Sequence, residues 1–496
     1  MSLLATETDI PQGSSAEPPK ISHAVLLTGA QLVRVLMRFL FVLVAARALG
    51  PKQFGVYTLL LAIVEITAVI SGVGYGDYLI RETAIDQRRG WGVGEQLTWL
   101  RIAYAIPLAG MGLGTLWLLG YPRFVLVATA WMSLTLVPRS LTEAVQGVLR
   151  GIGNYWEYIA LDLVLGFVLV LGAGVLLARG GGVLVVVASE LAAATAAGIL
   201  AFGLDLRLGT KERIRLKWSA LVKKSIVFNI YPFVTSLYDR IDVLLLSKLG
   251  GDYATGVYGA AYRPLNAVQL LPYGVLYSLL PALSRGDWRG AERERLERAM
   301  GLLLSAALVI VLTTMIFANA FVPLLLGARF AEAAGALKIL IWAVILRYLN
   351  YAVTIGLLAA KRERVLIVSS SVGVAVNFIG NLIFIPMFSY RAAAVLTIIT
   401  ELVVLTLNLN WLRRVTGTIP TPLGWARISF VFAALLIAAL AGAEVVSPPA
   451  IGTACLLFFL MYLYRTGMVG EFAAAWRTGR RLAWFSRKRF PEGGQA

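Results

Sequence analysis

Apolar residues along this chain come in runs of about 20, and each run ends in a short polar, Gly-containing or Pro-containing break. A helix of about 20 apolar residues is long enough to cross the hydrocarbon core of a bilayer. The pattern predicts about fourteen membrane-spanning helices, at residues 25–48, 54–75, 97–119, 124–146, 155–178, 183–204, 225–248, 253–281, 299–324, 336–359, 365–387, 391–412, 426–446 and 449–467. The chain is therefore predicted to be an all-α polytopic membrane protein.

Composition agrees with this pattern. Of the 496 residues 59% are hydrophobic and only 15% are charged, and the mean hydropathy is +0.78. A soluble protein of this length needs far more charge to cover its surface. Because no predicted loop exceeds about 20 residues, neither side of the membrane has room for a globular catalytic domain.

The first 24 residues do not have the pattern of a cleavable signal peptide. They contain Pro11, Pro18 and Pro19 and lack a basic start followed by an apolar run. A short disordered cytoplasmic tail is expected there. The single cysteine, Cys455, excludes an intrachain disulfide, and neither it nor the single histidine, His23, indicates a metal site or another cofactor.

The distribution of basic residues predicts the orientation. Of the 45 Lys and Arg residues, 30 fall in the two tails and the alternate loops that share one side, 8 fall in the other loops, and 7 lie within the spans. By the positive-inside rule both termini are cytoplasmic, as in a multi-pass protein of the inner (plasma) membrane. The net charge of +18 then reflects orientation and attraction to anionic membrane lipids, and nucleic acid is not an expected partner.

A short phrase occurs twice, as LGPKQFGVY from Leu49 and as LGGDYATGVY from Leu249. Aligning the two Leu-Gly pairs leaves the Gly-Val-Tyr triplets one residue out of step, so the predicted offset is about 200 with a single insertion. In both copies a helix is expected to end at Leu-Gly, because glycine supplies the left-handed residue that closes a helix, and Gly-Val-Tyr is expected to open the next helix.

The copies are separated by six predicted helices, which gives both the same orientation. This spacing predicts two parallel six-helix halves with a substrate site between them near mid-membrane. The expected organisation is a disordered tail (1–24), an N-terminal bundle (25–204), a basic cytoplasmic linker (205–224), a C-terminal bundle (225–413), two additional helices (414–470) and a basic cytoplasmic tail (471–496).

The repeat also carries a resemblance. The segment LGPKQFGVYTLLLAI, followed by SGVGY and LIRE, is similar to the start of polysaccharide-biosynthesis flippases of the multidrug/oligosaccharidyl-lipid/polysaccharide exporter superfamily, and YDRIDVLLLSKLGGDYATGVYGAAYRP resembles their seventh and eighth helices. The resemblance covers roughly residues 24–414. It implies that the protein moves a polyprenyl-pyrophosphate-linked sugar from the cytoplasmic to the outer leaflet, and that polysaccharide polymerase machinery is a candidate partner.

Seven basic residues fall inside the predicted spans, and all are arginine: Arg34, Arg38, Arg101, Arg139, Arg240, Arg263 and Arg347. A charge near mid-bilayer costs about 2.5–3.5 kcal/mol, so such residues usually face a cavity. Guanidinium groups stay charged and present a planar fork to phosphate oxygens. The pyrophosphate-binding candidates are therefore Arg34, Arg38, Arg240, Arg263 and Arg347.

The two other arginines have more ordinary explanations. Arg101 lies only about four residues into its span, so it is expected to extend to the membrane interface. Arg139 has Glu143 four residues on, which predicts a structural ion pair along one helix.

Eight acidic residues also lie within the spans, and four of them are candidates for binding a coupling ion: Glu65, Asp239, Asp242 and Glu401. Asp239 and Asp242 resemble the acid that recurs in the seventh helix of the family. Local pairing of these two residues with Arg240 is an equally good explanation.

Three functions compete. The preferred one is a flippase for lipid-linked oligosaccharides that works by alternating access. The second is a multidrug-type cation antiporter, against which the buried arginines argue. The third is a membrane-embedded glycosyltransferase or polymer ligase, for which the chain offers neither a large outer loop nor a paired-acid metal motif, so an enzyme is not expected. No Gly-rich ATP-binding motif followed by Lys-Ser/Thr occurs, and the driving force is left open.

Overall fold

The structure is a computed structural model of the chain. It describes residues 21–466 except 73–74, 211–213, 270–271, 273–278, 281–282, 284–289, 423 and 443–447. The predictions for the two tails fall largely outside these residues. The described part of the chain is helical and contains no strand.

The helices follow one another with short connections. In chain order they are α1 (Ile21–Ser71), α2 (Tyr75–Ile85), α3 (Gln87–Leu118), α4 (Arg123–Ser133), α5 (Leu136–Ile152), α6 (Tyr155–Arg179), α7 (Val183–Leu208), α8 (Trp218–Leu249), α9 (Gly251–Val268), α11 (Ala291–Leu326), the 3₁₀ turn η1 (Ala328–Phe330), α12 (Ala331–Leu340), α13 (Ala343–Ala359), α14 (Glu363–Phe388), α15 (Tyr390–Thr416), α16 (Trp425–Gly442) and α17 (Pro448–Arg465).

The predicted fold class is confirmed, because the predicted spans fall on helices throughout the described chain. By length and composition, seven stretches there can cross a membrane, and the pair of α12 and α13, bent by 45°, would make an eighth. The span predicted at 124–146 is interrupted between α4 and α5. The short helix α2 was not predicted, because its apolar residues are too few to form a span.

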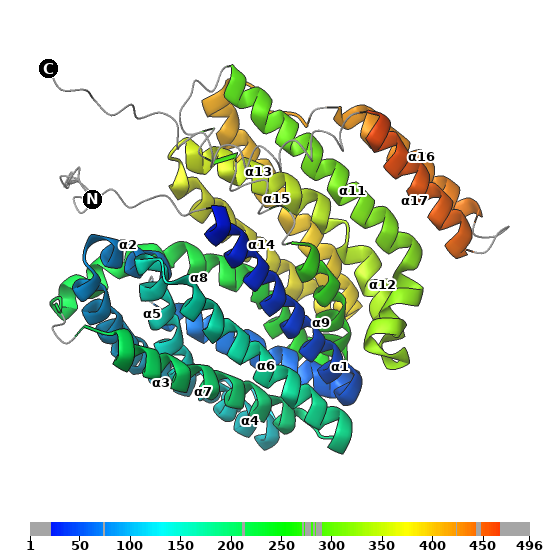
Figure 1. The fold of residues 1–496 in the computed structure, drawn as a ribbon. Coiled ribbons are helices and arrows are strands. Elements are labelled where there is room, and N and C mark those ends of the chain that lie inside the picture. The colour runs from blue at the N-terminus through cyan, green and yellow to red at the C-terminus, as the bar shows by residue number, and fades with distance from the viewer. Residues whose placement is uncertain are drawn as a thin grey trace, which may run out of the picture.

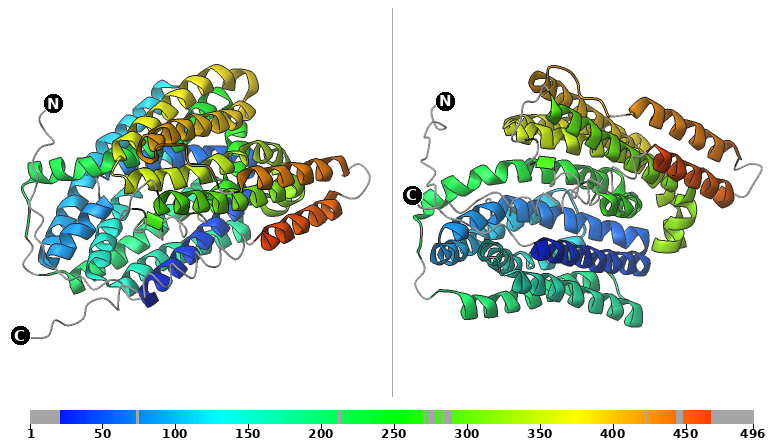
Figure 2. Two further views of the ribbon diagram at one scale, coloured as in Figure 1. Left: turned by 90° about the horizontal axis from the view of Figure 1, so that it is seen from above. Right: turned by 45° about the horizontal axis from the view of Figure 1, so that its top comes forward.

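Two groups of helices are visible in Figure 1. Helices α3 to α7 lie together in the lower part of the view, α11, α13 and α15 lie above them, and α1 runs diagonally between. Both views of Figure 2 place α16 and α17 at the periphery, and they contact α11. Helices α1, α8 and α9 contact one another where the two groups meet, so residues on these three helices are placed to line a site between the groups.

The two copies of the repeated phrase align without the single insertion that the sequence suggested. Within α1 the helix is broken at Gly50, whose φ is 66°. In the second copy the glycine with positive φ is Gly251, at 83°, whereas Gly250 keeps a right-handed conformation. Taking these two breaks as equivalent, the copies match at a constant offset of 201 residues and need no insertion. The alignment by Leu-Gly pairs was therefore wrong by one residue.

The two copies pack directly against each other. A Cβ placed on Gly55 would overlap the carbonyl oxygen of Asp252, and one placed on Gly256 would overlap the carbonyl oxygen of Pro51. Gly55 and Gly256 are themselves equivalent at the offset of 201, as are Pro51 and Asp252. The close contact between α1 and α9 is therefore nearly symmetric, and only glycine allows the two backbones to approach so closely.

Candidate functional site

A cavity of about 500 Å³ opens among α1, α5, α6 and α9. Its wall is rich in charge for a membrane-spanning bundle. The charged side chains that line it are Arg34, Arg38, Glu65, Arg139, Glu143, Asp162 and Arg263. Three of the predicted pyrophosphate candidates, Arg34, Arg38 and Arg263, thus meet at one cavity.

The two arginines of α1 each face an acid of the same helix group. Arg34 Nη1 lies 3.4 Å from Asp162 Oδ1, which also accepts a hydrogen bond of 3.0 Å from the side chain of Gln146. Arg38 Nη1 donates to Glu190 at 2.7 Å, and the Tyr57 hydroxyl donates to the same carboxylate at 2.6 Å. Both guanidinium groups therefore have a fixed carboxylate partner.

Arg240 and Glu65 form an ion pair that joins α8 to α1. Glu65 lines the cavity, while Arg240 lines a small neighbouring hollow together with Asp239. The expected pairing of Arg240 with its sequence neighbours Asp239 and Asp242 is not what the structure has, because a side chain from another helix takes its place.

Arg347 does not line the cavity. It is buried on α13, where it forms ion pairs with Glu401 of α15 and, at 3.5 Å, with Asp239 of α8. The Tyr238 side chain of α8 adjoins this cluster. These residues form a polar centre within the second helix group.

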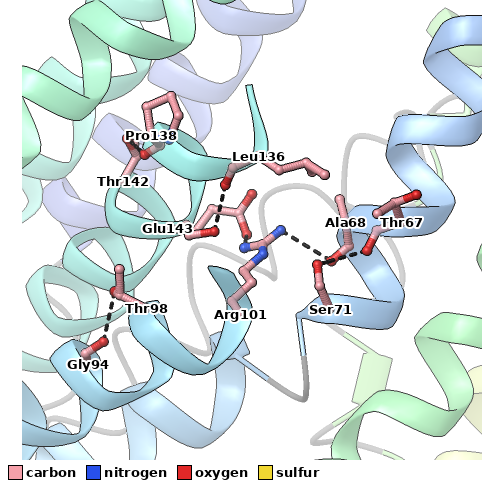
Figure 3. Close-up of polar contacts among 11 residues, drawn as sticks. Thr67, Ala68, Ser71, Gly94, Thr98, Arg101, Leu136, Pro138, Thr142 and Glu143 are labelled. Carbon is pink, nitrogen blue, oxygen red and sulfur yellow. Dashed lines mark hydrogen bonds and ion pairs between the residues drawn. The ribbon is translucent and has the colours of Figure 1, made fainter. Parts of the chain in front are cut away.

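Arg101 and Glu143 are paired across helices (Figure 3). Arg101 extends from α3 to the carboxylate of Glu143 on α5 and also donates to the carbonyl oxygen of Ala68 at 3.3 Å. Arg101 is only 3% exposed, so the expectation that it reaches the membrane interface was wrong. Glu143 forms its ion pair with Arg101 and not, as predicted, with Arg139 along one helix, although Arg139 lies near enough to attract the same carboxylate.

Arg139 lies at the cavity, although its sequence context predicted a structural ion pair. It lines the cavity, and no ion pair to it is found among the described residues. Spacing along one helix favoured Glu143 as its partner, and only the packing of α3 against α5 could have revealed the competing arginine.

Arg263 is the second cavity arginine without a carboxylate partner in the described chain. Its guanidinium lies 5.5 Å from the ring centroid of Phe54, a cation–π contact. Its Nε is buried and has no hydrogen-bond partner there. The guanidinium of Arg263 is thus held near an aromatic ring, and its buried Nε–H is left without a partner.

Among the four predicted coupling acids, Asp242 has a different environment from the others. It is 2% exposed and accepts hydrogen bonds from the Tyr258 hydroxyl and, at 2.7 Å, from the backbone N–H of Val243. Glu65, Asp239 and Glu401 each face an arginine, whereas Asp242 has no ion pair within the described residues. The same residues contain no cluster of three or more His, Cys, Asp or Glu that could hold a metal ion.

Comparison with known proteins shows similarity to a protein family and to a curated relative. The family model described as "Polysaccharide biosynthesis protein" matches residues 22–287. The probable low-salt glycan biosynthesis flippase Agl15 of Haloferax volcanii is 23% identical over 390 residues, which cover 76% of this chain and 80% of that protein.

Two solved structures share the fold at low sequence identity. The lipid II flippase MurJ in an inward closed conformation has a TM-score of 0.68 at 12% identity, covering 89% of this chain and 99% of that one. An inward-facing multidrug resistance transporter of the MATE family has a TM-score of 0.63 at 15% identity, covering 80% and 98%. These two likenesses concern the fold.

Proposed function

Because the chain belongs to the polysaccharide biosynthesis protein family, whose model matches residues 22–287, we propose that it is a flippase for cell-surface polysaccharide synthesis. Its substrate is a polyprenyl-pyrophosphate-linked oligosaccharide, carried from the cytoplasmic to the outer leaflet of the plasma membrane. The two six-helix halves (25–204 and 225–413) open the cavity alternately to the cytoplasmic and the outer side. Both termini are cytoplasmic. A polysaccharide polymerase receives the product.

The observation that carries this proposal is the excess of arginine at the cavity (Arg34, Arg38, Arg139 and Arg263). A preorganised set of guanidinium groups attracts a phosphate-containing headgroup and repels cations. A multidrug-type antiporter shares the fold but needs a cavity that attracts cationic drugs, so the charge of this cavity favours the flippase. The relatives named above are flippases and transporters, in agreement with a protein that is not an enzyme.

The test is to purify the full chain, reconstitute it in liposomes with a fluorescent polyprenyl-diphosphate-linked sugar, and measure which leaflet the lipid occupies. Liposomes without protein provide the control. We expect protein-dependent equilibration of the lipid between leaflets, and in a deletion strain we expect the lipid-linked precursor to accumulate on the cytoplasmic leaflet. If the precursor crosses normally in that strain while efflux of a cationic dye is lost, the antiporter is the correct function.

Coupling to an ion is proposed at Asp242. A buried carboxylate with neutral hydrogen-bond donors and no ion-paired arginine can bind a proton or a small cation, whereas Glu65, Asp239 and Glu401 are already neutralised. We expect Asp242→Asn to abolish the stimulation of lipid movement by an imposed Na⁺ or proton gradient. Binding of the lipid-linked sugar should stay within about twofold, since the change is isosteric and Asp242 does not line the cavity.

Asp252→Asn, near the outer end of α9, is the matched control and should leave the stimulation unchanged. An Asp242→Asn variant that responds to both gradients like the parent protein would exclude this residue as the coupling site.

A further inference from the structure

The charges at the cavity do not balance. The charged residues of the wall and their direct ion-pair partners comprise six arginines (Arg34, Arg38, Arg101, Arg139, Arg240 and Arg263) and four acids (Glu65, Glu143, Asp162 and Glu190). Each acid forms an ion pair with one of these arginines, and no ion pair to Arg139 or Arg263 is found in the described chain, although Arg139 also attracts Glu143 and Glu190. The cavity therefore keeps two positive charges in excess, and these belong to Arg139 and Arg263.

Monophosphate-linked and diphosphate-linked lipid headgroups differ in their negative charge. A polyprenyl monophosphate ester-linked to a sugar carries one negative charge, because its phosphate is a diester, whereas a diphosphate linkage carries one on each of its two phosphates. An unpaired charge in a low-dielectric site is costly, so a ligand that neutralises both guanidinium groups is favoured over one that leaves one of them uncompensated.

We propose that Arg139 and Arg263 together bind a diphosphate linkage, one phosphate to each guanidinium, and that Arg139 determines the preference for diphosphate-linked over monophosphate-linked substrates. The proposal rests on the flippase function. The arginines of α1 hold their acids and shape the wall, and Arg263 is oriented by the ring of Phe54. Arg139, which lines the same cavity from α5, supplies the second charge.

Binding of two short-chain probes to the purified full-length protein tests this, one a farnesyl diphosphate and the other a farnesyl monophosphate, each linked to the same N-acetylhexosamine. The parent protein should prefer the diphosphate probe by about tenfold or more. Arg139→Gln should weaken binding of the diphosphate probe by about tenfold or more, because the charge-assisted contact to its second phosphate is lost. It should weaken binding of the monophosphate probe far less, because that probe has no second phosphate. Arg139→Lys should restore part of the preference, since it keeps the charge but not the fork.

Arg150→Gln, on the same helix outside the cavity, is the control and should bind both probes like the parent. If the parent binds the two probes equally, or if Arg139→Gln weakens both equally with the fold intact by thermal unfolding, the assignment of Arg139 is wrong and the flippase function stands. If the parent binds neither probe while its thermal unfolding is normal, the flippase function itself is contradicted.

A second set of contacts joins the two helix groups at the end that the proposed orientation places on the outer side. The Arg47 side chain of α1 donates from Nε to the carbonyl oxygen of Leu325, at 2.8 Å, and also to that of Leu324, both in the last turn of α11. The Lys248 side chain of α8 donates to the carbonyl oxygen of Leu119, which caps α3. Lys248 also lies 5.5 Å from the ring centroid of Tyr121, whose hydroxyl bonds the Ser247 hydroxyl at 3.1 Å.

These two contacts are equivalent under the repeat. Arg47 lies three residues before Gly50, and Lys248 lies three residues before Gly251, the two glycines with positive φ. Each cation caps the C-terminal carbonyls of a helix in the other group, where the helix dipole concentrates negative charge. Both arrangements use solvent-exposed side chains, which can detach at little cost when the groups move apart.

We infer that Arg47 and Lys248 form a two-part latch that holds the outer side closed and must open before the cavity can face outward. A labelling experiment tests this without any substrate. In a Cys455→Ala background, Asn266→Cys places one thiol in the cavity wall, and a membrane-impermeant maleimide is applied to the outer face of intact cells.

Adding Arg47→Gln and Lys248→Gln together should raise the labelling rate by about fivefold or more. The two changes remove contacts from the outward-closed conformation, so the outward-open population grows. Each single change should give an intermediate rate, and the single variants decide the question if the double variant does not accumulate. Lys52→Gln, an exposed outer lysine without a hydrogen bond in the described chain, should label at the parent rate. Equal rates in the parent and the latch variants would overturn the latch.

Discussion

Gly256→Ala is expected to destabilise the protein by at least about 3 kcal/mol, a large effect for the addition of one methyl group. In most helices the same change is stabilising by about 0.5–1 kcal/mol, because alanine has the higher helix propensity. Here the new Cβ would overlap the backbone carbonyl of Pro51, and a backbone atom cannot rotate out of the way as a side chain can. The measurement is the apparent melting temperature of the purified protein in detergent, together with its yield from membranes.

Gly114→Ala is the matched control, since Gly114 lies within the helix α3 but has no atom within 4 Å of the position that a Cβ would take. It should be neutral or slightly stabilising. Gly55→Ala should behave like Gly256→Ala because the contact is nearly symmetric. Equal melting temperatures for Gly256→Ala and Gly114→Ala would mean that α1 and α9 do not pack backbone to backbone.

Arg347→Leu is expected to cost about 3–5 kcal/mol of stability, because removing one partner of a buried ion pair leaves an uncompensated charge. Two carboxylates, Glu401 and Asp239, face this guanidinium, and Glu401 is 2% exposed. Arg347 would then stabilise the second helix group instead of binding the pyrophosphate, for which it was a candidate by its depth in the membrane. Thermal unfolding of the purified variant measures the loss.

The double variant Arg347→Leu with Glu401→Gln should recover a substantial part of that stability, because it removes the stranded charge along with its partner. Arg364→Leu, on an exposed position of α14, is the control and should have little effect. If Arg347→Leu is as stable as the parent but no longer binds a polyprenyl diphosphate, Arg347 contacts substrate and the structural role is wrong.

The helices and the repeat could be predicted from the sequence because both are written in local patterns. Apolar runs of membrane length have few alternatives to helix in a bilayer, and the Leu-Gly pair at 49–50 predicts the break that the structure has at Gly50. The backbone crossing at Gly55 and Gly256 was not predicted. The register of the repeat could not be predicted as closely, because Gly250 and Gly251 are adjacent and only the backbone conformation distinguishes which of them breaks the helix.

Which arginine pairs with which acid could not be predicted from the sequence, for a different reason. Arg139 and Glu143 are correctly spaced for a pair on one helix, yet Arg101 from α3 occupies the carboxylate. Likewise Arg240 stands between two aspartates and pairs with Glu65 of α1 instead. Partners in a helix bundle are chosen by interhelical distance, and a single sequence contains no direct record of that distance.

The contact between Gly55 and Gly256 also has a mechanical consequence. The two helices touch backbone to backbone at this one point, with no side chains between them. They can therefore tilt about the contact without changing their separation, and the crossing can serve as a pivot. By the rise per residue, the stretch from Gly256 to the end of α9 at Val268 is a lever arm of about 18 Å, and a tilt of about 10° moves its end by about 3 Å. The cavity residue Arg263 lies along this arm, so a small rotation of one half against the other changes its distance from Arg139 directly.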